Sequence, residues 1–255
     1  GYDLVGLKIF SNELSSSAKM IRITKKQDRK PWVVVGGPHV SGSPRRTMEC
    51  VKEADFGFQG EAEGGFPMLV KSIHDRDSSS YSEIPGLIFR EEKALRVNPQ
   101  VFPQDLDELG MPSWSLMPPR TYPKESFGLF VKNFPTAPII TTRGCPFHCT
   151  YCAGYRVTGR RFRKRSIDRI IEELSLLKGE FGVKDFTIVD DNFTLQKPFA
   201  LAVCEAILRN RLDLSWSCPN GVRLDTLDRE LIQAMEAAGC YSVAVGIESG
   251  SERVL

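Results

Sequence analysis

The sequence lacks any apolar run near the ~18 residues that a membrane-spanning helix requires, and its polar amino terminus shows no signal-peptide pattern. It also lacks internal repeats and low-complexity segments. With 34 Lys and Arg against 32 Asp and Glu, the formal net charge is only +2, so composition gives no argument for nucleic acid or an acidic partner. These absences predict a soluble cytoplasmic protein without a membrane segment.

A disulfide framework is also missing. The seven cysteines are an odd number, three of them stand close together, and a reducing compartment therefore fits best. Cys204 falls on one helical stripe with Leu201 and Leu208, which predicts core packing. A second metal site built from the remaining three is an alternative that their scattered spacing does not support. These three are Cys50, Cys218 and Cys240.

Residues 141–153 hold the other three cysteines, Cys145, Cys149 and Cys152, in a Cys-x3-Cys-x2-Cys spacing. Thiolates this close in sequence can converge on one four-iron cluster. Three thiolates leave one iron open, and an open iron can bind a small molecule. A structural zinc site would need a fourth ligand; His148 is the candidate, but as the neighbour of Cys149 it should project away. Three core cysteines or a zinc site remain the alternatives.

The first third of the chain alternates predicted strands with predicted helices, which favours a parallel α/β sheet. A polar loop and a hairpin follow, and accumulated prolines then predict a surface linker. We therefore predict an α/β domain over residues 1–98, a linker over 99–134 and a second domain over 135–255. The expected strands are 3–10, 32–40, 55–58, 86–89 and 95–98, and the expected helices are 15–26, 45–53 and 66–74.

The second half contains four predicted βα units, which suit a TIM-like barrel. Its first helix should begin after Ser166 as N-cap and end at Gly179. The expected strands are 137–142, 185–189, 214–218 and 241–247, and two further helices are expected at 198–209 and 227–238.

Candidate functional residues follow these strands, at the end where TIM-barrel sites lie. They are Asp190, Asp191, Asn220, Arg223, Glu248 and Ser249. The two aspartates could instead be helix N-caps, and Arg223 could be a solvated or ion-paired surface charge. The basic run 160–165 is either a solvated face, which we favour, or an anion site beside the cysteines.

The cysteine motif, the apolar strand that leads into it and the aromatic Tyr151 before its last cysteine resemble the radical S-adenosylmethionine (SAM) superfamily. The resemblance implies a partial barrel of six βα units, of which four are present. It implies that the three cysteines bind a four-iron four-sulfur cluster and that SAM is cleaved reductively to a 5′-deoxyadenosyl radical. The residues expected near SAM are Tyr151, Asp190, Asp191, Arg223, Glu248 and Ser249.

Residues 33–39, with the Gly36-Gly37 pair after a strand, and residues 60–63 together resemble the cobalamin-binding, Rossmann-like domain that often precedes a radical SAM domain. The resemblance implies that Gly36 and Gly37 line the nucleotide tail of cobalamin and that His39 is a loop residue near it. The sequence departs from this family in two respects. It lacks the first two strands with their cobalt-binding histidine loop, and Lys8 stands where a serine is common.

The function that the resemblance implies is cobalamin-dependent methyl transfer to an unactivated carbon of an unidentified small or lipid-like substrate. A flavodoxin or ferredoxin would be the reductant. The alternatives are a radical SAM cyclase or rearrangement enzyme with a scaffold-only first domain, and an iron–sulfur electron-transfer or zinc-stabilised binding protein. Under this resemblance both domains are incomplete, so we expect a fragment whose open barrel edges make it aggregate when expressed alone.

Overall fold

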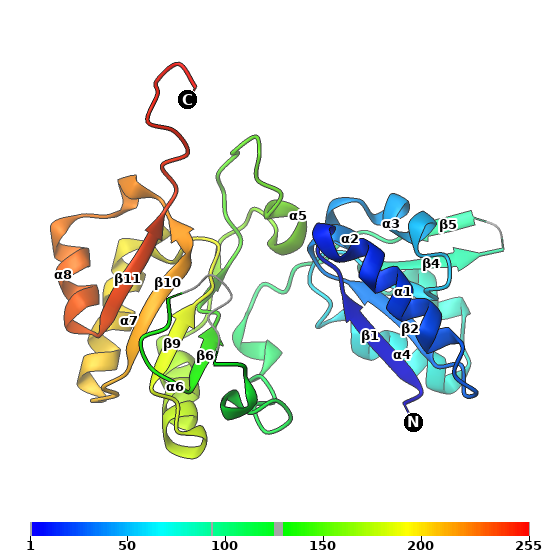
Figure 1. Ribbon diagram of the computed structural model, residues 1–255, viewed down its shortest axis with the longest axis horizontal. Coiled ribbons are helices and arrows are strands. Elements are labelled where there is room, and N and C mark those ends of the chain that lie inside the picture. The colour runs from blue at the N-terminus through cyan, green and yellow to red at the C-terminus, as the bar shows by residue number, and fades with distance from the viewer. Residues whose placement is uncertain (1, 93, 125–129, 255) are drawn as a thin grey trace. The chain divides into compact units, whose positions relative to one another are not determined.

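The computed structural model describes residues 2–92, 94–124 and 130–254. Its residues fall into two compact units (Figure 1). The first unit is formed by 1–104 and 146–160, and the second by 105–145 and 161–255. The division places Cys145 in the second unit and the residues immediately after it in the first. No helix of the described part is long and apolar enough to cross a membrane.

The first unit is built on a five-stranded sheet in the order β1-β2-β3-β4-β5. Neighbouring strands are parallel from β1 to β3 and antiparallel from β3 to β5, so the predicted alternation and hairpin are confirmed. The strands are β1 (Leu4–Lys8), β2 (Trp32–Gly36), β3 (Phe56–Phe58), β4 (Leu87–Glu91) and β5 (Ala94–Val97).

Both faces of this sheet are covered, because successive side chains of a strand point to opposite faces. Val33 and Val35 pack into one apolar cluster with residues of α1 and α3, whereas Val34 packs into another with Leu69 of α4. The helices are α1 (Leu14–Lys25), α2 (Pro38–Gly42), α3 (Pro44–Cys50), α4 (Gly65–Asp75) and the short α5 (Tyr155–Thr158).

The predicted strand 32–40 is too long. Strand β2 ends at Gly36, Gly37 takes a positive φ of 95°, and Pro38 opens helix α2. Proline suits the first helical turn because its φ is fixed near the helical value and no amide hydrogen is lost there. His39 therefore lies in a helix and not in the loop that we predicted.

The second unit contains a four-stranded parallel sheet in the order β11-β10-β9-β6. Sequential parallel strands joined by helices place those helices on one face (Figure 1). The strands are β6 (Thr136–Ile139), β9 (Asp185–Ile188), β10 (Ser215–Val222) and β11 (Cys240–Val245). The helices are α6 (Ile167–Phe181), α7 (Lys197–Arg209) and α8 (Arg229–Ala237), and a separate ribbon pairs β7 (Thr142–Arg143) with β8 (Arg163–Lys164).

Helix α6 begins as predicted, because the Ser166 hydroxyl accepts a hydrogen bond from Arg169 N at 3.3 Å. It ends two residues later than predicted. Gly179 is accommodated within the helix, and Gly182, with a φ of 65°, terminates it. Glycine weakens a helix interior by only about 1 kcal/mol, so a well-packed helix can continue through it.

The core of the second unit centres on Trp216, which stacks on Phe186 at 5.8 Å and meets Phe193 edge-on at 5.8 Å. Cys204 is buried in this core, as predicted, but Leu208 on the same helix is 49% exposed. The proline-rich segment is more than a surface linker, because it contributes the buried Trp114 to the core; its residues 125–129 lie outside the described part. The short 3-10 helices are 11–13, 79–83, 107–109, 119–121, 193–195 and 224–226.

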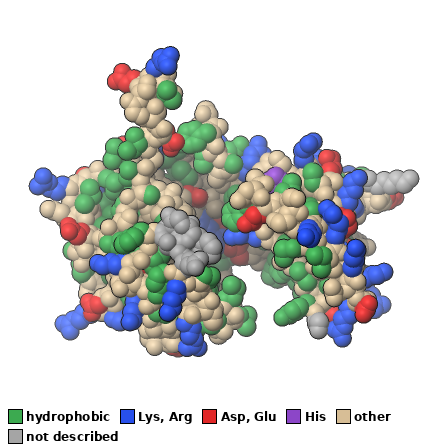
Figure 2. All heavy atoms as spheres, in the orientation of Figure 1, with side chains coloured by type: hydrophobic (Ala, Val, Ile, Leu, Met, Phe, Trp, Pro, Cys, Tyr) green, Lys and Arg blue, Asp and Glu red, His purple; other side chains and the backbone are tan. Residues whose placement is uncertain are grey.

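Charged side chains of both signs occur on the face shown in Figure 2. On the face shown in Figure 2, Lys and Arg lie among Asp and Glu. This agrees with the nearly neutral composition.

Candidate functional site

The strand predicted at 137–142 is interrupted immediately before the cysteine loop. Strand β6 ends at Ile139, and the chain then turns to form β7, which pairs with β8 and not with the main sheet. Two hydrogen bonds from Arg165 fix this turn: Arg165 N donates to Thr141 O at 2.9 Å, and the Arg165 guanidinium donates to Ile140 O at 3.0 Å. The segment leading into Cys145 is therefore held outside the main sheet.

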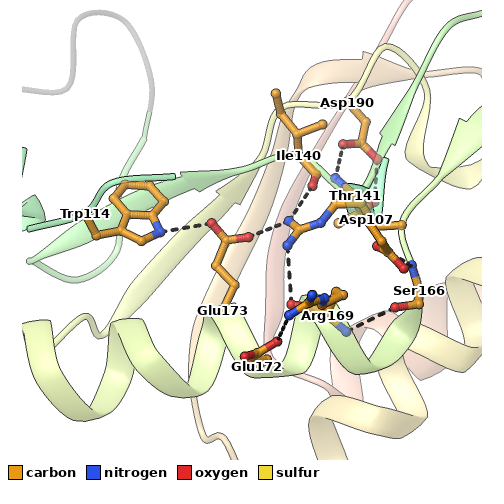
Figure 3. A network of polar contacts seen from close by, with 10 residues as sticks. Asp107, Trp114, Ile140, Thr141, Ser166, Arg169, Glu172, Glu173 and Asp190 are labelled. Atoms are coloured by element: carbon orange, nitrogen blue, oxygen red, sulfur yellow. Dashed lines mark hydrogen bonds and ion pairs between the residues drawn. The ribbon is translucent and has the colours of Figure 1, made fainter. Parts of the chain in front are cut away.

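Asp190, which follows β9, holds the same segment (Figure 3). One carboxylate oxygen accepts from Thr141 N at 2.7 Å. The other accepts from the Thr141 hydroxyl at 2.5 Å and the Thr142 hydroxyl at 2.7 Å. Because Asp190 is only 3% exposed, these three donors replace the water that its carboxylate would otherwise bind.

Asp191 contacts the next part of the same segment, at Gly144. Its Oδ2 accepts a hydrogen bond from Gly144 N at 3.1 Å, next to Cys145. The helix that follows β9 has Gln196 as its N-cap position, and the short turn before it has Asn192. The alternative interpretation of the two aspartates as helix N-caps is therefore wrong. Contact of either aspartate with SAM stays a prediction.

Burial raises the pKa of Asp190 from 3.8 to about 6, although the hydrogen bonds from Thr141 and Thr142 oppose the shift. Between pH 3.8 and about 6, the native protein keeps a proton at Asp190 that the unfolded chain has released. The stabilisation from this proton is complete below the unfolded pKa of 3.8 and is lost as the pH rises through about 6.

The Asp190→Asn variant removes this titration. We expect the free energy of unfolding of the wild type, relative to that of the variant, to fall as the pH rises from 3.8 to about 6, by up to about 1.4 kcal/mol per pH unit. Urea unfolding of the iron-free protein, followed by tryptophan fluorescence, measures the slope. Glu180→Gln, an exposed carboxylate of α6, is the control and should keep the wild-type slope; an identical slope for Asp190→Asn would contradict the prediction.

A buried ion pair fixes Arg165, which donates to Ile140 O in the segment before Cys145 (Figure 3). Arg165 pairs with Glu173 of α6, whose other carboxylate oxygen accepts from Trp114 Nε1 at 3.0 Å. The side chains of Arg165 and Glu173 are 10% and 1% exposed. The basic run 160–165 is thus not simply a solvated face, because Arg163 and Arg165 are buried. Arg163 is the buried residue of β8, Lys164 is exposed, and Arg165 follows the strand directly.

The three motif cysteines lie on loop residues. Cys145 and Cys149 are partly buried and Cys152 is exposed, and none of the three forms a disulfide. Cys149 and Cys152 are joined by a turn in which Cys152 N donates to Cys149 O at 3.2 Å. Three cysteine thiols in one loop are a donor set that fits a four-iron cluster. The described residues contain no preformed group of three or more His, Cys, Asp or Glu side chains around a metal position.

The loop segment 146–160 is anchored within the first unit. Its helix α5 contacts α2, and Gln100 Nε2 donates to Arg156 O at 3.0 Å. The Arg160 guanidinium lies 4.1 Å from the ring centre of Tyr155 and donates to Phe147 O at 2.7 Å. Cys149 and Cys152 therefore belong to the same compact unit as the Gly36-Gly37 turn.

Three of the four remaining cysteines have a raised thiol pKa. Metals bind the thiolate form of cysteine, and burial raises the pKa of the Cys204 thiol to about 12, that of Cys240 to about 11 and that of Cys218 well above 9.0. This disfavours the second metal site that the sequence left open for Cys50, Cys218 and Cys240.

Other predicted site residues lie at the ends of β10 and β11 in the second unit. Arg223 is ion-paired with Asp225, with Nε to Oδ1 at 2.9 Å, in agreement with the ion-paired alternative, and Asn220 donates to Val189 O at 2.7 Å. Glu248 has a positive φ of 62°, and Ser249 follows it in an irregular loop. Tyr151 is mostly exposed. Their contacts with SAM stay predictions.

The sequence did not predict one further residue at the carboxyl ends of the strands of the second unit. Asn192 is buried after β9, and its Nδ2 is the single buried side-chain nitrogen or oxygen without a hydrogen-bond partner among the described residues. Buried polar atoms are normally paired, so an unpaired amide at the carboxyl end of a parallel strand fits a site that accommodates a polar ligand. The sequence offered no signal, because Asn192 is one of three consecutive polar residues.

The predicted cobalamin residues lie together after β2. A side chain at Gly37 would approach Lys8 Cγ to 2.7 Å, so close packing against β1 explains this glycine. At Gly36, an added Cβ would lie 3.8 Å from Phe58 O, an ordinary van der Waals contact, so packing within the protein does not require this glycine. His39 Nδ1 is hydrogen bonded to the Ser11 hydroxyl at 2.9 Å. A glycine that packing does not require, at the carboxyl end of a parallel strand, fits a backbone approached by a ligand such as cobalamin.

Comparison with protein families matches the two parts of the chain separately. Residues 139–255 match the radical SAM superfamily, and residues 1–70 match the B12 binding domain. The carboxyl-terminal part of the chain therefore belongs to the radical SAM superfamily, and a B12-binding domain precedes it.

Individual relatives share both parts. The chain is 34% identical over 254 residues to an uncharacterized methyltransferase of Pyrococcus horikoshii, covering 99% of this chain and 53% of that protein. It is 26% identical over 255 residues to the anaerobic magnesium-protoporphyrin IX monomethyl ester cyclase of Cereibacter sphaeroides, covering 98% and 40%. The radical SAM methyltransferase TsrM of Kitasatospora setae has a similar fold, with a TM-score of 0.76 at 21% identity over 100% of this chain and 50% of that one. The chain thus spans about half the length of these relatives or less.

Proposed function

We propose that this protein is a cobalamin-dependent radical SAM methyltransferase acting on an unactivated carbon. The observation that carries the proposal is the Cys145, Cys149 and Cys152 motif within the segment that matches the radical SAM superfamily, after a segment that matches a B12-binding domain. When bound, the cluster and SAM would supply a 5′-deoxyadenosyl radical, and cobalamin would supply a methyl carrier.

The chain's own residues would bind and orient these groups. The three cysteine thiolates would hold three irons of the cluster and leave the fourth for SAM. The polar residues after β9, β10 and β11 would contact SAM, and the backbone at Gly36 would contact cobalamin. The strand ends supply these positions because parallel strands bring their carboxyl ends to one edge.

The substrate would be a small or lipid-like molecule, and the electron would come from a flavodoxin or ferredoxin. The similarity to an uncharacterized methyltransferase favours methyl transfer. A second candidate, cyclisation without methyl transfer, is favoured by the similarity to the magnesium-protoporphyrin cyclase.

Anaerobic reconstitution of the full-length protein tests the proposal. We expect about four irons per chain and cleavage of SAM to methionine and 5′-deoxyadenosine under reductant. Cobalamin added in excess should remain bound after gel filtration, as its visible absorption will show. Bound zinc without SAM cleavage would contradict the enzyme, and SAM cleavage without cobalamin binding would favour the second candidate.

A further inference from the structure

Two consecutive carboxylates hold the segment 141–144, which leads into Cys145. Asp190 accepts from the backbone and hydroxyl of Thr141 and from the hydroxyl of Thr142, and Asp191 accepts from Gly144 N. We propose that Asp190 and Asp191 form a clamp of positioning residues that fixes the direction in which the chain enters Cys145. Its purpose in cluster binding rests on the proposed function, whereas the clamp itself does not.

The chemistry of the clamp explains why a carboxylate is needed at position 190. The side chain must accept three hydrogen bonds in a buried place, and an ionised carboxylate makes stronger hydrogen bonds than a neutral acceptor. Thr141 and Thr142 are also buried, so without Asp190 their hydroxyls and the Thr141 amide would lack this acceptor. Opening of the segment toward water would satisfy them.

The opening should be local. Asp190 contacts the loop before Cys145, whereas the apolar core of the second unit is formed by Trp216, Phe186 and their neighbours. Local opening has its own free energy, which is distinct from that of global unfolding. Loss of the clamp should therefore expose Cys145 while the core stays closed.

The cysteines of the second unit supply the probes for this test. Cys145 follows the clamp, and the buried Cys204 and Cys218 report opening of the core. In the iron-free full-length protein, alkylation by iodoacetamide is followed at each cysteine by mass spectrometry. For Asp190→Ala we expect alkylation of Cys145 to accelerate roughly tenfold, with Cys204 and Cys218 reacting at their wild-type rates.

Thr142→Val is the second variant, since it keeps the carboxylate and removes one hydrogen bond. It should accelerate Cys145 less than Asp190→Ala does, and it provides the test if Asp190→Ala does not fold. Glu180→Gln is the control and should change no rate. A wild-type rate at Cys145 in the folded variants, or acceleration of Cys204 and Cys218 in parallel with Cys145, would overturn the clamp.

This experiment separates the clamp from the proposed function. Alkylation is measured without iron or SAM, so its result does not depend on whether the protein cleaves SAM. A protein with an intact clamp that fails to bind iron would count against the proposed function alone.

Discussion

Replacement of Cys149 by alanine is expected to abolish cluster assembly and SAM cleavage in the full-length protein. Two thiolates would remain where three are needed to hold a four-iron cluster with one open position. The iron content after anaerobic reconstitution should fall from about four per chain to below about one. Iron assay and chromatographic detection of 5′-deoxyadenosine measure the two effects.

The matched control is Cys50→Ala, which removes an exposed cysteine outside the motif. This variant should keep the wild-type iron content and cleavage rate. Equal losses in both variants would show that any cysteine change damages the protein, and unchanged iron in Cys149→Ala would remove Cys149 from the proposed cluster.

Replacement of Arg165 by methionine is expected to destabilise the protein by about 3–5 kcal/mol, because it leaves Glu173 as a buried charge without its cation. Trp114 would still donate to Glu173, but one neutral hydrogen bond does not compensate a buried carboxylate. Ile140 O would lose its guanidinium donor as well. Urea unfolding monitored by tryptophan fluorescence measures the change.

Arg169→Met, on the helix that carries Glu173, provides the control. Arg169 pairs with Glu172 at 2.8 Å, and both side chains are more than half exposed, so its loss should cost less than about 1 kcal/mol. Adding Glu173→Gln to Arg165→Met should recover part of the lost stability, because no buried charge then remains unpaired. Equal costs for the two methionine variants would refute the special role of the buried pair.

The sequence was informative wherever a feature is local. The cysteine spacing, the order of strands and helices, and the Ser166 cap each depend on residues within a few positions of one another. Two errors concerned the ends of elements. Gly37 and Pro38, a local signal that the apolar run concealed, end β2 at Gly36, whereas packing carries α6 through Gly179.

The contacts that support the candidate site could not be predicted, because they join distant residues. Asp190 meets Thr141 across 49 positions, and Trp114 meets Glu173 across 59. These pairs depend on how β6 lies against β9 and on how the proline-rich segment packs against α6. Sequence patterns indicate that each element forms but do not specify which polar side chains face each other.

The dependence of the Thr141 segment on Asp190 also has a consequence for biosynthesis. The ribosome adds Thr141 to the chain 49 residues before Asp190. At typical elongation rates, synthesis of these residues takes about 2–10 seconds. During that interval the hydroxyls of Thr141 and Thr142 can bond only to water, because the carboxylate that accepts from them in the folded protein has not yet been made. On the proposed function, iron and sulfide would meet a fixed Cys145 only after β9 has emerged and docked.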